Sequence, residues 1–88
     1  MKKLYRTHLS KRLVHILKRM HEEELDLVYS KGVAYVGEEG TSKKTILKLL
    51  KLCLISCDDY SNFDKMERYV INEDGVKAYQ NGFIDRPI

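Results

Sequence analysis

The chain of 88 residues has no tryptophan, one proline, two cysteines and five glycines. It also lacks a run of about 20 apolar residues, the length that a membrane-spanning helix needs. Its basic N-terminal segment is interrupted by charges every few residues, unlike the apolar region of a signal peptide. We therefore expect one cytoplasmic domain with a small core, whose cysteines are reduced thiols.

The motifs of common catalytic and metal sites are missing as well. There is no glycine-rich phosphate loop, nucleophile elbow or His-Glu-x-x-His helix. Cys53 and Cys57 do not have the Cys-x-x-Cys spacing that is usual for zinc ligands. We predict no enzyme activity, no cofactor and no metal, and we expect both thiols to be buried near the end of a helix.

What the chain does have is charge in alternating blocks. The net charge is only +3, but residues 1–20 contain lysine and arginine without any acid. Residues 22–39 are mainly acidic, residues 43–51 are basic, and the remaining C-terminal part is again mainly acidic. Faces of opposite charge can steer a charged partner towards the protein.

Apolar residues at helical spacing predict a first helix over residues 9–23. Thr7 or Ser10 can cap its start. The basic residues of the segment fall outside the apolar stripe, so they should face solvent. The stripe consists of Leu9, Leu13, Ile16, Leu17 and Met20.

Residues 25–36 alternate on either side of Lys31-Gly32. Alternation, β-branched and aromatic residues and a glycine turn favour a β-hairpin. A short helix over residues 33–39 is the alternative, because this segment could also be the second helix of a helix-turn-helix.

A basic helix is predicted over residues 42–52, after a cap at Thr41 or Ser42 and the acids Glu38 and Glu39. One side carries lysines at positions i, i+4 and i+7, namely Lys44, Lys48 and Lys51. The other side is apolar and should pack into the core. It comprises Ile46, Leu47, Leu49, Leu50 and Cys53.

The C-terminal part is predicted to contain a polar loop, a strand and a short helix. The loop covers residues 56–65 and the strand residues 66–71. The helix has Asn72 as its cap and Asn81-Gly82 as its stop. Residues 83–88 are expected to form an extended tail.

This order of elements resembles that of winged-helix proteins among small bacterial and phage regulators. Leu54-Ile55 matches the pair that leads from a recognition helix into the wing in those proteins. Tyr69-Val70-Ile71-Asn72-Glu73-Asp74-Gly75 resembles the return strand of the wing and the Thr-Glu-x-Gly-like turn that it reaches. The resemblance covers residues 41–80 and, loosely, the first helix. The hairpin predicted before the basic helix departs from the family, which has a helix there.

The resemblance implies an α+β fold, a single winged-helix-like domain over residues 1–88 with about three helices and one or two β-hairpins. A basic arm would cover about residues 1–8, with the tail at the other end. The function implied is a small nucleic-acid-binding regulator, such as a phage or prophage transcription regulator, that contacts mainly DNA phosphates. The predicted contact residues are Lys43, Lys44, Thr45, Lys48, Lys51, Lys2, Lys3, Arg6, Lys11 and Arg12.

Other interpretations of the same residues stay open. The lysine stripe could be the solvated back of an ordinary amphipathic helix. The rival function is a protein–protein interaction module, which the acidic wing and the tyrosines Tyr60, Tyr69 and Tyr79 favour. For the nucleic-acid-binding form we expect duplex DNA as partner and a homodimer, paired through the first helix or through the C-terminal helix and tail. Base edges could be touched by Thr41, Ser42 or Thr45.

Overall fold

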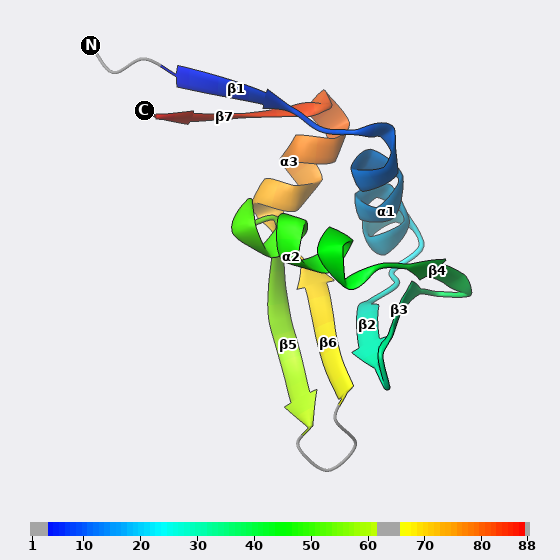
Figure 1. Cartoon of the computed structure of the whole chain (residues 1–88). Coiled ribbons are helices and arrows are strands. Elements are labelled where there is room, and N and C mark those ends of the chain that lie inside the picture. Colours follow the sequence, from blue (N-terminus) through cyan, green and yellow to red (C-terminus); the bar gives the residue numbers. More distant parts are fainter. Residues whose placement is uncertain (1–3, 62–65, 88) are drawn as a thin grey trace.

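The computed structural model describes residues 4–61 and 66–87 of the chain. Within these residues three helices accompany a five-stranded antiparallel sheet and a separate two-stranded ribbon (Figure 1). The predicted α+β class is therefore confirmed. No helix in these two stretches is long and apolar enough to cross a membrane.

The three helices begin at side-chain caps. Ser10, Ser42 and Asn72 each accept a hydrogen bond from the backbone N–H three residues further on. All three predicted helices are thus confirmed, with Ser10 rather than Thr7 as the first cap. The helices are α1 (Lys11–Glu22), α2 (Lys43–Lys51) and α3 (Glu73–Asn81).

The end of α2 differs from the prediction. Cys53 takes a left-handed conformation (φ 59°), and the N–H of Leu54 bonds to the carbonyl oxygen of Leu49 at 3.0 Å. This is a Schellman motif, which turns the chain away from the apolar side of the helix and leaves Cys53 at the surface. Cys57 in the next strand is exposed as well. The expectation that both thiols are buried is wrong.

The sheet has the strand order β4-β3-β2-β6-β5, and all neighbouring strands are antiparallel. The hairpin β2–β3 confirms the prediction for residues 25–36, so the alternative helix over residues 33–39 is not formed. Lys31 (φ 52°) and Gly32 (φ 79°) make its two-residue turn, which has the left-handed residues of a type I′ turn. The strands are β2 (Leu27–Ser30), β3 (Val33–Val36), β4 (Glu39–Thr41), β5 (Ile55–Ser61) and β6 (Met66–Ile71).

The polar loop predicted over residues 56–65 is wrong as far as Ser61, because β5 extends to that residue. β5 pairs with β6 and lies at an edge of the sheet, where water can solvate polar side chains. A bulge between Cys57 and Asp59 shifts the register of the pair. Residues 62–65 lie outside the described residues.

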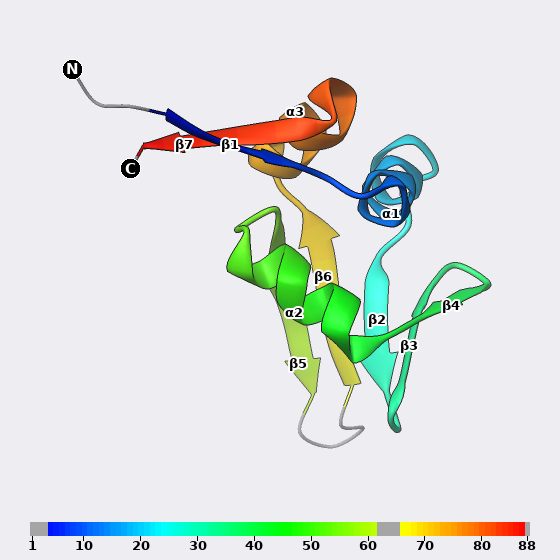
Figure 2. The ribbon, with the colours of Figure 1, turned by 45° about the horizontal axis from the view of Figure 1, so that its top comes forward.

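The two ends of the chain form a ribbon, from β1 (Leu4–His8) and β7 (Phe83–Pro87). The predicted arm and tail are therefore paired strands over most of their length. The Arg6 guanidinium makes two hydrogen bonds to the Asp85 carboxylate, of 2.9 and 3.2 Å, and lies 3.9 Å from the centre of the Phe83 ring. Figure 2 shows that the ribbon extends past α3, and the start of β1 pairs with the end of β7.

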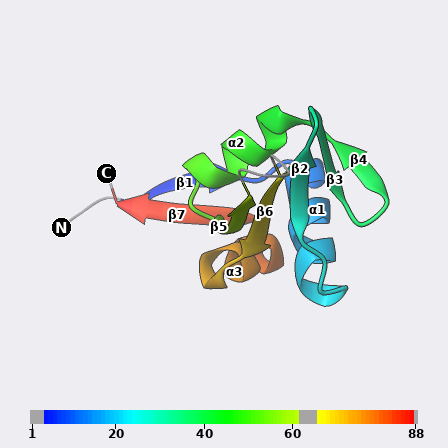
Figure 3. The ribbon, with the colours of Figure 1, turned by 90° about the horizontal axis from the view of Figure 1, so that it is seen from below.

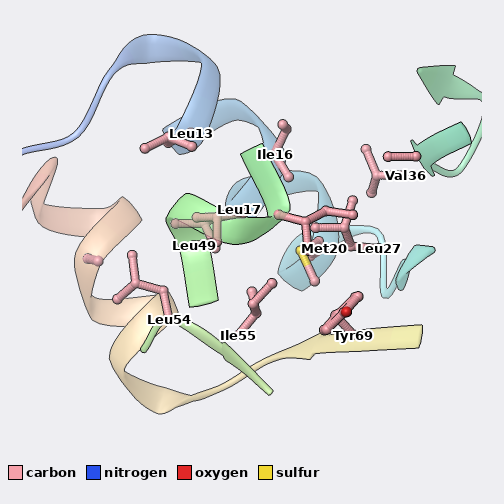
Figure 4. Packing of buried hydrophobic residues seen from close by; sticks show 13 residues of the cluster. Leu13, Ile16, Leu17, Met20, Leu27, Val36, Leu49, Leu54, Ile55 and Tyr69 are labelled. Atoms are coloured by element: carbon pink, nitrogen blue, oxygen red, sulfur yellow. The ribbon is translucent and has the colours of Figure 1, made fainter. Parts of the chain in front are cut away.

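The core lies between α1 and the sheet, with α2 and α3 closing it (Figure 4). The apolar stripe predicted for the first helix is confirmed, because four of its residues are buried and Leu9 packs against them. Tyr69, which the rival function used as an interface anchor, is part of this core. The buried residues of α1 are Leu13, Ile16, Leu17 and Met20.

α3 meets the junction of α2 and β5 at very close range. The backbone N–H of Asn72 donates to the Leu54 carbonyl oxygen at 3.2 Å, and the Asn72 side chain donates to the Cys53 carbonyl oxygen at 2.9 Å. Gly75 is buried there, and a Cβ atom on it would overlap the Leu54 carbonyl oxygen. The glycine in the first turn of α3 therefore permits this close contact.

Candidate nucleic-acid interface

α2 lies on the outer surface of the molecule, across the front of the sheet. Figure 1 shows it in front of β5 and β6, and Figure 3 shows the sheet on one side of it only. Its inner side buries Ile46 and Leu49, which are 1% and 0% exposed. The opposite side is therefore open to solvent.

The open side of α2 is strongly basic. Lys43, Lys44, Lys48 and Lys51 are all exposed, which confirms that the predicted lysine stripe faces solvent. α2 contains no acidic residue. Within the described parts of the chain, none of the ion pairs involves a lysine of α2. The ammonium group of Lys43 lies 4.4 Å from the centre of the Tyr29 ring, which holds this side chain near the sheet.

Leu47 lies among these lysines and was assigned wrongly to the core. It is 54% exposed, because the side of α2 that packs against the sheet is narrower than the stripe of apolar residues in the helix. At 3.6 residues per turn, Lys43 and Lys51 lie about 40° to either side of Leu47 around the helix axis. We call the exposed set Lys43, Lys44, Leu47, Lys48 and Lys51 the lysine face.

Thr45 does not belong to the lysine face, although it was predicted as a contact residue. It lies about 160° around the helix from Leu47 and is half-buried. Its backbone N–H donates to Ser42 Oγ at 3.4 Å, and its hydroxyl lies 3.2 Å from the same atom. The hydroxyl of Thr41 lies 3.4 Å from Nη2 of Arg12, which donates to it. The hydroxyls expected to touch base edges therefore have partners within the protein.

The fold brings one residue of the N-terminal basic block to the start of α2. Arg12 of α1 donates from Nη2 to the carbonyl oxygen of Gly40 at 3.3 Å, two residues before the cap of α2. Arg12 is exposed, so its charge extends the lysine face at the N-terminal end of the helix. The neighbouring Lys11 is exposed on the first turn of α1.

The other predicted contact residues of the N-terminal block are not placed at the lysine face. Arg6 belongs to the terminal ribbon, where Asp85 neutralises its charge. Lys2 and Lys3 lie outside the described residues. The predicted arm therefore contributes no described cation that is available beside α2.

Of the two acids that precede α2, Glu39 is neutralised by neighbouring basic side chains. Glu39 lies in β4, where its carboxylate is 2.8 Å from Nε2 of His15 and 3.1 Å from Nη1 of Arg19. The hydrogen bond with His15, followed by that with Arg19, lowers the pKa of Glu39 below its ordinary value. Glu38 is exposed in the turn before it.

No group of three or more His, Cys, Asp or Glu residues able to hold a metal ion occurs in residues 4–61 and 66–87. The geometry thus defines a small α+β domain with one exposed basic helix. Comparison with protein-family models, with curated proteins and with solved structures gives no match.

Proposed function

We propose that the protein is a small nucleic-acid-binding regulator of winged-helix type, whose lysine face contacts the phosphate backbone of duplex DNA. The main support for this proposal is the lysine face, which presents four cations and no acid on one side of a surface helix. Lysines arranged in this way neutralise phosphates and release their counterions. Arg12 beside the helix start and the neutralised carboxylate of Glu39 add to the same effect.

The winged-helix part of the proposal rests on the order α1, α2 and the hairpin β5–β6, in which the hairpin would be the wing. The strands β2, β3 and β4 stand where the family has a helix between α1 and α2. α2 therefore packs against a sheet, and its outer side is the part that can approach DNA. The exposed Asp58 in the middle of β5 makes this strand a poor phosphate contact, so the lysine face would dominate binding.

A homodimer would double the basic surface, and we propose it on this ground. The apolar side of α1 is buried within its own chain, so we favour the other predicted pairing surface, the C-terminal helix and tail. The tail is the strand β7, which pairs with β1 in the ribbon. A sheet of only two strands is marginally stable in water, so a second copy that pairs with its edge would stabilise it.

The test is a titration of fluorescent duplex DNA with the protein at several salt concentrations. Four phosphate contacts predict a slope of about −3 to −4 for the logarithm of the binding constant against that of salt concentration. The variant Lys44→Gln with Lys48→Gln should lower the size of this slope by about 2. Lys18→Gln with Lys77→Gln is the matched control, because it removes the same charge from α1 and α3, outside the lysine face.

If the control variant weakens binding as much as the α2 variant does, net charge rather than the lysine face attracts DNA and the proposed site is wrong. If no binding occurs at low salt, the proposed function itself is wrong. Capture of a protein partner would then be the next experiment.

A further inference from the structure

We propose that Leu47 contacts thymine methyl groups in the major groove and so gives the lysine face a preference for sites that contain thymine. This inference rests on the proposed function, since it assumes that α2 approaches duplex DNA. It deepens that function, because phosphate contacts alone carry no sequence information.

Leu47 contributes little to the core. It is 54% exposed, whereas Ile46 and Leu49 fill the inner side of the same helix. In the described residues only one other large apolar side chain is exposed to a similar extent, Val33 at 56%. An exposed leucine is not unusual by itself. Its position between cations is the feature that points to a ligand.

Phosphate binding does not explain an apolar side chain at this place. Lys43 and Lys51 lie about 40° to either side of Leu47, so a polar side chain there would suit a phosphate backbone better. A ligand that covers the whole lysine face must instead present an apolar group between two rows of negative charge. A partner that offers only charge would leave Leu47 against polar atoms and without a favourable contact.

Duplex DNA has this arrangement in its major groove. The groove is about 12 Å wide and admits one α-helix, and phosphates line both of its walls. The only apolar group that base edges present there is the C5 methyl of thymine. With Lys44, Lys48 and Lys51 reaching one wall and Lys43, once it leaves the Tyr29 ring, reaching the other, the shorter leucine would face the base edges between them.

Other means of reading thymine are few on the face. Within the described residues, α2 carries no Arg, Asn or Gln, the side chains that bond bases in a bidentate manner. The hydroxyls of Ser42 and Thr45 bond with each other at the helix cap. The lysines themselves can bond only to guanine O6 and N7, so the methyl contact of Leu47 is the contact by which the lysine face can read thymine.

The experiment compares two duplexes that differ only in the C5 methyl group. One contains thymine, and in the other every thymine is replaced by uracil. Binding of the whole protein should weaken by about fourfold for each contacted methyl that is lost. The salt slope should be the same for both duplexes, because the phosphates are unchanged. Conversely, replacing cytosine by 5-methylcytosine in a G·C duplex should strengthen binding.

Two variants separate the leucine from the rest of the surface. Leu47→Ala should bind both duplexes equally while keeping the salt slope, and circular dichroism should show that it folds. Val33→Ala, the matched control at the other exposed apolar residue, should still prefer thymine. Equal binding of the two duplexes by the unaltered protein overturns the inference but leaves the proposed function standing. The same holds if Leu47→Ala prefers the thymine duplex as strongly as the unaltered protein does. Absence of salt-dependent binding overturns both.

Discussion

Replacing Gly75 by alanine places a methyl group where α3 meets the end of α2. The backbone of Gly75 has no left-handed conformation that would require glycine. Helix propensity alone therefore predicts that alanine stabilises the protein by up to about 1 kcal/mol. The close contact between α3 and Leu54 predicts that alanine destabilises the protein. The sign of the measured change in the free energy of unfolding therefore shows which of the two effects is larger.

The added Cβ would overlap the carbonyl oxygen of Leu54 and would lie 2.6 Å from Cγ1 of Ile71. The isoleucine can move, but the carbonyl is backbone and accepts the 3.2 Å hydrogen bond of Asn72. Overpacking of a filled site costs about 1–3 kcal/mol. Because the overlapped atom is backbone, the cost should lie in the upper half of this range, about 2–3 kcal/mol. After the gain of about 1 kcal/mol in helix propensity, we expect Gly75→Ala to lower the free energy of unfolding by about 1–2 kcal/mol.

Urea unfolding followed by circular dichroism measures this change. Gly40→Ala is the matched control, because a Cβ atom on Gly40 meets nothing within 4 Å. Its free energy of unfolding should stay within about 0.5 kcal/mol of that of the unaltered protein. A Gly75→Ala variant as stable as the unaltered protein would refute the close packing of α3 against Leu54.

Three further predictions concern stability. Cys53→Gly should raise the free energy of unfolding in urea by up to about 1 kcal/mol, because glycine takes the left-handed conformation without strain. Glu39 has a lowered pKa, chiefly through its hydrogen bond with His15. The ionised Glu39 carboxylate should therefore stabilise the protein fully at pH values above its ordinary pKa of 4.5. This stabilisation should be lost as the pH falls through the lowered pKa of the folded state. Glu39→Gln should therefore flatten the acid side of a plot of thermal midpoint against pH. Burial and the Glu67 carboxylate raise the pKa of Tyr69 from 10.0 to about 12. Stability should therefore fall as the pH rises from about 10 towards 12, and less so in Tyr69→Phe, as thermal unfolding at each pH would show.

The helices were predictable because each has a local signal. Ser10, Ser42 and Asn72 precede their helices, and the apolar spacing within α1 is regular. The hairpin of residues 25–36 was equally local, since its turn and both strands are adjacent in the sequence. Local signals of this kind need no knowledge of the rest of the fold.

The terminal ribbon was not predictable in this way. It pairs Arg6 with Asp85, residues that are 79 positions apart, and nothing in either segment identifies its partner. β5 was not predicted, because its polar residues are typical of a loop. Only their pairing with β6 makes this segment a strand. Pairing between distant segments is decided by the whole fold.

For the candidate site, the sequence identified the lysines but not Leu47. Apolar residues on α2 span about 160° of the helix, from Leu49 through Ile46 and Leu50 to Leu47. The sheet on one side of the helix fully buries only Ile46 and Leu49. A helix packed on one side buries a stripe a little over 100° wide. Where the apolar stripe of the sequence is broader than this, its outermost residue is exposed. Which edge of the stripe is exposed depends on how the helix is rotated against the sheet.

The salt dependence of DNA binding by the lysine face tests the proposed function most directly. We expect binding to generic duplex DNA with a slope of about −3 to −4, and a slope smaller by about 2 when Lys44 and Lys48 are both replaced by glutamine. The same slope in the unaltered protein and in this variant, or no binding at low salt, would contradict it.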